Sequence, residues 1–83
     1  MTITVFERTS SYCVQCVGTK RALDKAGIPY KAVAIEDQPA EWLQAHKDNG
    51  LMTAPIVEVS HADGTTEAWS GLRPDKISEL EVA

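Results

Sequence analysis

The sequence is short of positive charge. Its 83 residues contain 8 Lys and Arg against 12 Asp and Glu, so the formal net charge at pH 7 is −4 with histidine neutral. Proteins that bind the phosphate backbone of nucleic acids usually carry a basic face. We therefore expect no nucleic-acid partner.

The chain also lacks long apolar runs. No stretch approaches the roughly 20 residues that a membrane-spanning helix needs, and residues 1–8 do not combine a basic start with an apolar core. We therefore expect no membrane segment and a cytoplasmic location. No repeat, low-complexity stretch or linker divides the chain, so residues 1–83 are predicted to form a single domain, and we expect a monomer.

Cysteine is scarce as well, and the two that occur lie together in Cys13-Val14-Gln15-Cys16. One helical turn separates them, so their side chains share a face and can form a disulfide. Closing so short a loop removes little entropy from the unfolded chain, which makes the pair a poor structural staple. In a reducing cytoplasm a close cysteine pair is usually catalytic or metal-binding. The motif therefore favours redox chemistry.

The two cysteines are predicted to differ because they lie at the start of a helix. Unpaired amides and the positive end of the helix dipole favour the thiolate form of Cys13. Cys16, one turn later, is better placed to attack a mixed disulfide and release the product. Two alternatives stay open. One is a zinc site that recruits His46 and His61, and the other is a structural disulfide or a pair of inert buried thiols.

Hydrophobic alternation and turn residues predict a sequence of strands and helices. Strands are predicted at Thr2–Arg8, Tyr30–Ile35, Ile56–Val59 and Thr65–Trp69, and helices at Val14–Ala26, from Asp37-Gln38-Pro39 to about Asp48, and from Pro74 onward. The order β-α-β-α-β-β-α predicts an α/β fold with a four-stranded mixed sheet, its first two strands parallel and its last two a hairpin. A C-x-x-C motif beside a βαβ unit is typical of a thioredoxin-like fold.

Four segments together resemble the glutaredoxin-like redoxins of the NrdH type. They are Cys13-Val14-Gln15-Cys16, Thr19-Lys20-Arg21-Ala22-Leu23, Thr53-Ala54-Pro55 and Trp69-Ser70-Gly71-Leu72-Arg73-Pro74-Asp75. The resemblance covers nearly the whole chain. It implies a thioredoxin fold and a thiol-disulfide oxidoreductase that carries electrons between proteins.

The resemblance also implies partners and roles. The carrier would be reduced by thioredoxin reductase, which takes its electrons from NADPH, and would reduce the active-site disulfide of class Ib ribonucleotide reductase. Cys13 would be the attacking thiolate and Cys16 the resolving thiol. The redox-active group would be the Cys13–Cys16 disulfide itself, with no bound cofactor or metal and with NADPH used only through the reductase.

A partner-binding surface around the cysteines is implied in the same way. Its residues are Val14, Gln15, Thr53, Ala54, Pro55, Trp69, Ser70, Gly71 and Arg73. Pro55 matches the family's cis-proline, beside which the Ala54 backbone would pair with an extended substrate segment. Trp69 is equally well explained as a core residue. Arg73 could bond to the backbone of residues 69–71, to a partner carboxylate, or only to solvent.

The chain departs from the family that it resembles at positions that bear on the choice of reductant. Glutaredoxins that use glutathione typically have a Gly-Gly-x-Asp turn after strand four, and here Ser70-Gly71-Leu72-Arg73 replaces it, which implies a weak glutathione site. Leu72 stands where the family often has Phe, and the approach Arg8–Tyr12 is longer than the family's. The alternatives are a glutaredoxin served by glutathione or another small thiol and, from a different class, a non-catalytic metal-binding or interaction module. His46 and His61 are predicted to be solvated.

Overall fold

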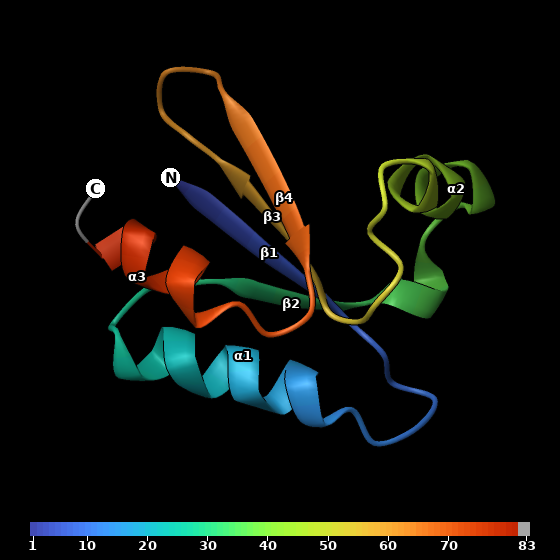
Figure 1. Cartoon of the computed structure of the whole chain (residues 1–83), viewed down its shortest axis with the longest axis horizontal. Helices are drawn as coiled ribbons and strands as arrows, with labels where there is room; N and C mark the ends of the chain where they lie inside the picture. Colours follow the sequence, from blue (N-terminus) through green and yellow to red (C-terminus); the bar gives the residue numbers. More distant parts are fainter. Residues whose placement is uncertain (82–83) are drawn as a thin grey trace.

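The computed structural model describes residues 1–81, which form one four-stranded sheet with helices on both faces (Figure 1). The elements are β1 (Thr2–Glu7), α1 (Val14–Lys25), β2 (Lys31–Ala34), the 3₁₀ turn η1 (Ile35–Asp37), α2 (Ala40–Asp48), β3 (Ile56–Ser60), β4 (Thr66–Ser70) and α3 (Pro74–Glu81). The predicted order and fold class are confirmed.

The sheet order is β2-β1-β3-β4, which places β1 and β3 at its centre. β1 pairs in parallel with β2 and antiparallel with β3, while β3 and β4 form the predicted hairpin. α1 makes the crossover between the two parallel strands. The chain leaves β1 at the middle of the sheet and reaches α1, which begins at the cysteine motif, through the loop of residues 8–12.

Alternation along β1 assigns its side chains to two different layers. Ile3 and Val5 face the main core, which α1 and α3 cover. The core consists of Ile3, Val5, Leu23, Ile28, Val57, Val59, Trp69, Ile77 and Leu80. Phe6 faces the opposite side, where its ring lies 4.4 Å from that of Trp42 on α2. Both faces of β1 are therefore packed. At the end of the strand that leads to the cysteines, Val5 packs in the main core and Phe6 packs against Trp42.

One prediction about α2 is wrong. His46 is not solvated: its side chain is 15% exposed, its Nε2 lies 2.8 Å from Glu58 Oε2 on β3, and its ring meets Trp42 edge-on. His61, just after β3, keeps 27% of its side chain exposed to solvent and has a carboxylate partner, with Nε2 3.0 Å from Glu67 Oε2 across the hairpin. Both pairs join positions whose proximity depends on the folded sheet, so local polarity could not reveal them.

The turn η1 was not predicted as a separate element. A 3₁₀ turn of three residues has no hydrophobic period to detect, and residues 37–39 were instead assigned to the start of the following helix. The α-helix begins only at Ala40, with Pro39 as its cap. None of the helices within residues 1–81 has the length and apolar character needed to cross a bilayer.

Candidate active site

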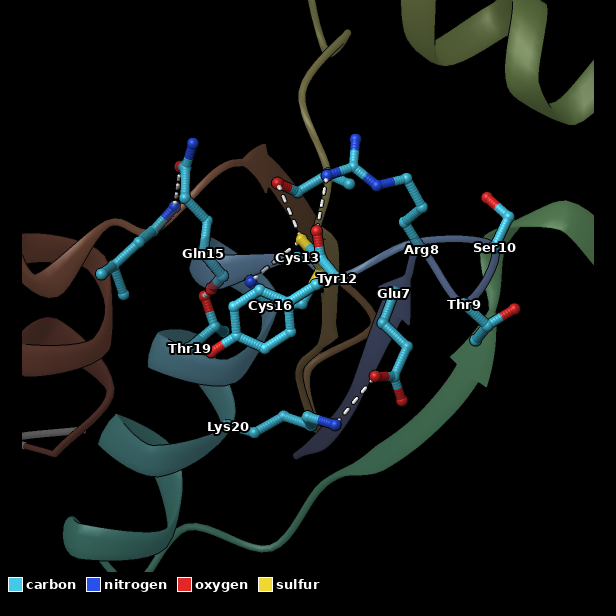
Figure 2. The surroundings of a disulfide bond; sticks show 12 residues. Glu7, Arg8, Thr9, Ser10, Tyr12, Cys13, Gln15, Cys16, Thr19 and Lys20 are labelled. Carbon is cyan, nitrogen blue, oxygen red and sulfur yellow. Dashed lines mark hydrogen bonds and ion pairs between the residues drawn. A yellow bond between two sulfur atoms is a disulfide. The ribbon is translucent and has the colours of Figure 1, made fainter.

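The cysteine motif lies where β1 gives way to α1. Cys13 is the N-cap of α1 with an extended backbone, and its Sγ accepts a hydrogen bond of 3.2 Å from the Cys16 amide. That amide is one of those left without a partner by the helix itself. The structure joins Cys13 and Cys16 in a disulfide with the two Cα atoms 5.2 Å apart (Figure 2). The pair is therefore competent for dithiol-disulfide exchange.

The two sulfurs differ in access. Cys13 is 6% exposed and lines a surface cavity of about 380 Å³, whereas Cys16 is 1% exposed and does not line it. The neighbours of Cys13 in this cavity include Tyr12, Val14 and Thr53. A partner approaching from solvent therefore meets the Cys13 sulfur first.

The segment before β3 closes the cavity opposite the cysteines. The Ala54–Pro55 peptide bond is cis, as the resemblance implied, and the Ala54 carbonyl oxygen lies 3.9 Å from Cys13 Sγ. The Pro55 carbonyl accepts a 2.8 Å hydrogen bond from the Gly71 amide. Within residues 1–81 the Ala54 amide has no hydrogen-bond partner, so it is available to an extended segment lying against the site.

Gln15 ties the cysteine motif to the loop between β4 and α3. Its Oε1 accepts a 2.9 Å hydrogen bond from the Leu72 amide. Gly71 next to it has φ +77°, and a Cβ at this position would come within 2.8 Å of the same Oε1. The left-handed backbone favours glycine, and a larger residue here would displace the end of the Gln15 side chain. Gln15 and Gly71 therefore hold the loop between β4 and α3 against the cysteine motif.

Trp69 does not contribute its side chain to the cavity. It is 2% exposed and belongs to the main core, paired with Val57 in the sheet. Its Nε1 has no hydrogen-bond partner within the described residues. The structure therefore supports the core role for Trp69. Because the indole is buried, the prediction that it contacts a partner is corrected.

Ser70 and Arg73 also lie outside the cavity that Cys13 lines. Ser70 ends β4 opposite Ile56 in the sheet. Arg73 does not bond to the backbone of residues 69–71; its guanidinium binds the Asp75 carboxylate, at 2.8 Å from Nη2 to Oδ2, and this holds the pKa of that carboxyl below its ordinary value. The Arg73 guanidinium is thus paired with Asp75 at the start of α3.

Three exposed apolar side chains line the cavity that contains Cys13, and we call this set the apolar rim. Its members and their exposed fractions are Tyr12 at 75%, Val14 at 68% and Met52 at 73%. Of these, only Val14 was predicted as a partner-binding residue. Tyr12 and Met52 could have been found by their position, since each directly precedes a predicted site residue. Clustered exposed apolar side chains mark a surface that binds another molecule.

Comparison with known proteins agrees with this geometry. Residues 3–62 match the Glutaredoxin family. The chain is 34% identical to the glutaredoxin-like protein NrdH of Escherichia coli strain K12, over 100% of this chain and 93% of the relative. This chain is a glutaredoxin-like redoxin of the NrdH type. The redoxin is a thiol-disulfide oxidoreductase, and its Cys13–Cys16 pair can form a disulfide.

Solved structures similar to the redoxin support the same assignment. The NrdH-redoxin of Escherichia coli superposes with a TM-score of 0.73 at 34% identity, covering 96% of this chain and 95% of that one. The glutaredoxin of Archaeoglobus fulgidus gives a TM-score of 0.63 at 20% identity, covering 94% and 83%. The likeness to the Archaeoglobus fulgidus glutaredoxin shows the fold alone. The likeness to the Escherichia coli NrdH-redoxin also supports the NrdH type within the family.

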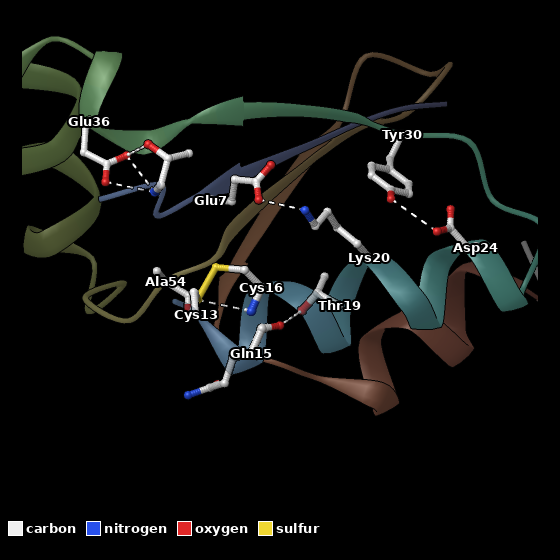
Figure 3. A network of polar contacts seen from close by, with 11 residues as sticks. Glu7, Cys13, Gln15, Cys16, Thr19, Lys20, Asp24, Tyr30, Glu36 and Ala54 are labelled. Carbon is white, nitrogen blue, oxygen red and sulfur yellow. Dashed lines mark hydrogen bonds and ion pairs between the residues drawn. A yellow bond between two sulfur atoms is a disulfide. The ribbon is translucent and has the colours of Figure 1, made fainter. Parts of the chain in front are cut away.

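The charged groups near the cysteines are mostly paired. Lys20, one turn after Cys16, has its ammonium 2.8 Å from Glu7 Oε1 on β1, and this hydrogen bond raises the pKa of Lys20 (Figure 3). The cation that lines the Cys13 cavity is Arg8, whose Nη2 donates to the Tyr12 carbonyl at 3.3 Å. Within residues 1–81, no group of three or more His, Cys, Asp or Glu side chains is arranged to hold a metal.

Glu36 on η1 binds the loop that leads to Cys13. Its carboxylate accepts hydrogen bonds from the Ser10 amide at 2.8 Å, the Thr9 amide at 2.9 Å and the Thr9 hydroxyl at 3.0 Å. The Ser10 amide is the largest cause that lowers the pKa of Glu36 to about 2 from its ordinary 4.5, with smaller contributions from the amides of Glu36 itself and Thr9. Sequence patterns missed this residue because it contacts positions 26 and 27 residues away.

Glu36 should make the stability of the redoxin depend on pH. Because its pKa is lower in the folded than in the unfolded chain, its stabilising contribution is present above pH 4.5 and is lost as the pH falls toward 2. Glu36→Gln should lower the urea midpoint at pH 7, and the difference from the native chain should vanish near pH 2. Asp37→Asn, on the same turn, is the control. A difference that stayed constant over this range would contradict the assignment.

Proposed function

We propose that the redoxin is a dithiol electron carrier that is reduced by thioredoxin reductase and reduces the active-site disulfide of class Ib ribonucleotide reductase. The carrying observation is that Cys13, the cysteine that lines the surface cavity, shares this cavity with the apolar rim. A surface of this kind suits a protein partner, since exposed apolar patches are typical of protein-binding sites. The electrons would be stored in the cysteine pair with no bound cofactor or metal.

The proposed exchange takes place in two displacements. In the reduced carrier the Cys13 thiolate attacks one sulfur of the partner's disulfide, which forms a mixed disulfide and releases the partner's other sulfur as a thiolate. The Cys16 thiolate, its proton lost to solvent, then attacks Cys13 Sγ and releases the partner's first sulfur. The partner gains two electrons, and the carrier is left with the Cys13–Cys16 disulfide. Thioredoxin reductase reverses this exchange with electrons from NADPH.

Several features support thioredoxin reductase over glutathione as the electron donor. Glutathione carries two carboxylates, whereas Arg8 is the single cation among the residues that line the Cys13 cavity within the described chain. Arg73 is engaged by Asp75. The similar NrdH-redoxin of Escherichia coli has a thioredoxin-like activity profile. A carrier fed by an NADPH-dependent reductase belongs in the reducing cytoplasm.

The proposal is tested by following NADPH oxidation with insulin disulfides as the acceptor. One reaction contains thioredoxin reductase, and the other contains glutathione with glutathione reductase. We expect turnover that depends on the redoxin in the first reaction only, and none with Cys13→Ser. Turnover with glutathione alone would overturn the proposed donor, and silence in both would overturn the carrier function. Where the first reaction works, ribonucleotide reduction by a class Ib enzyme should depend on adding the redoxin.

A further inference from the structure

The loop from Thr9 to Tyr12 has few internal constraints. All four of its residues are exposed, and within residues 1–81 none of them takes part in a backbone-to-backbone hydrogen bond. Such a loop would sample many conformations, because each residue fixed in a single backbone state costs about 1–2 kcal/mol in entropy. Something outside the loop must therefore hold it in place.

Two side chains outside the loop restrain it, Glu36 on η1 at its first half and Arg8, just before it, at its last residue. The Glu36 carboxylate holds the first half through Thr9 and Ser10, and Figure 3 shows Glu36 with its hydrogen bonds. Arg8 holds the second half through the Tyr12 carbonyl. Both side chains line a neighbouring cavity of about 260 Å³, together with Lys47. Of the two restraints, Glu36 makes the shorter and more numerous contacts.

The loop ends at the reactive sulfur. Tyr12 directly precedes Cys13, lines the cavity that contains it, and is the most exposed member of the apolar rim. The position of this ring therefore depends on the loop, and the loop depends on Glu36. Glu36 itself does not line the Cys13 cavity.

We propose that Glu36 is a positioning residue that fixes the Thr9–Tyr12 loop, and with it Tyr12, as a preformed part of the surface on which a protein disulfide docks. This inference rests on the proposed function in that a protein supplies the disulfide. A preformed wall spares the partner the entropy of ordering the loop, so Glu36 acts on binding. A small disulfide offers little surface to a wall that includes Tyr12, so its reduction should depend much less on Glu36.

The test measures steady-state reduction of insulin and of hydroxyethyl disulfide, with dithiothreitol as the reductant so that no reductase is involved. Glu36→Gln should raise the KM for insulin by about three- to tenfold, the range expected for ordering one or two side chains on binding, with kcat within about twofold. The kcat/KM for hydroxyethyl disulfide should stay within about twofold. An unchanged KM for insulin, or equal losses on both substrates, would overturn the inference.

Two further variants separate the hydrogen bonds from charge. Glu36→Asp keeps the charge on a shorter side chain and should raise the KM like Glu36→Gln, so native behaviour in this variant would contradict the role of the bonds. Asp37→Asn removes a charge from the same turn, and the Asp37 side chain makes no hydrogen bond within residues 1–81, so it should behave as the native chain. Thermal melting of each variant at the assay pH shows whether it is folded.

A double-mutant cycle with Tyr12→Ala tests whether Glu36 acts through Tyr12. If it does, Glu36→Gln should have little further effect on the KM for insulin once the ring is absent. Fully additive effects would overturn this route. A native chain that failed to reduce insulin at all would instead overturn the proposed function, so the two failures are distinguishable.

Discussion

Cys13→Ser is expected to lower the rate of disulfide reduction by about a thousandfold or more, to the rate of the uncatalysed background. A serine hydroxyl is not ionised at neutral pH and is a far weaker nucleophile than a thiolate. The buried Cys16 cannot replace it, because this residue is 1% exposed and does not line the cavity. The measurement is insulin reduction with dithiothreitol. Full activity of this variant would contradict the assignment of Cys13 as nucleophile.

Cys16→Ser is the matched variant and should fail at a different step. Cys13 can still attack a partner's disulfide, but no second thiol then releases the product. A covalent complex between Cys13 and the partner should therefore accumulate, visible by non-reducing electrophoresis and abolished by reductant. The Cys13→Ser variant should form no such complex with the same partner.

Leu23→Ala should cause a large loss of stability, about 2–5 kcal/mol. Leu23 is fully buried on α1 at the centre of the main core. Truncation removes its apolar contacts and leaves a cavity that the surrounding sheet can fill only in part. A domain of this size has a total stability of about 5–15 kcal/mol, so the variant should be close to the limit of folding. Urea denaturation followed by circular dichroism measures the loss.

Leu72→Ala makes the same chemical change on the surface and is the control for this prediction. Leu72 is 37% exposed, so its truncation should cost under about 1 kcal/mol. Equal losses of stability for the two variants would mean that α1 does not pack on the sheet as described.

The fold was predictable because its signals are local. Ile3 and Val5 alternate with Phe6 on the opposite face, and Gly27 and Pro29 end the helix that starts at the cysteines. The C-x-x-C spacing also carries its chemistry within one helical turn. Each of these patterns lies within a few residues, so the sequence alone was sufficient to recognise it.

The details that shape the site depend on distant residues and could not be predicted. Glu36 reaches the loop before Cys13 across more than 25 residues, a contact that no period in the sequence encodes. Trp69 had two equally good explanations, and only its burial in the sheet decides between them. Lys20 could have contributed free positive charge near the cysteines, but Glu7 on β1 pairs with it.

Only one of the two cysteines, Cys13, lines the surface cavity, and this limits how electron donor and acceptor can bind. Whatever reduces the Cys13–Cys16 disulfide must approach Cys13, and whatever is later reduced must approach the same atom through the same opening. Donor and acceptor are therefore competitors for one place and cannot be bound together. We therefore expect ping-pong kinetics, in which an excess of donor slows transfer by occupying the reduced carrier that the acceptor needs, and an excess of acceptor by occupying the oxidised carrier that the donor needs.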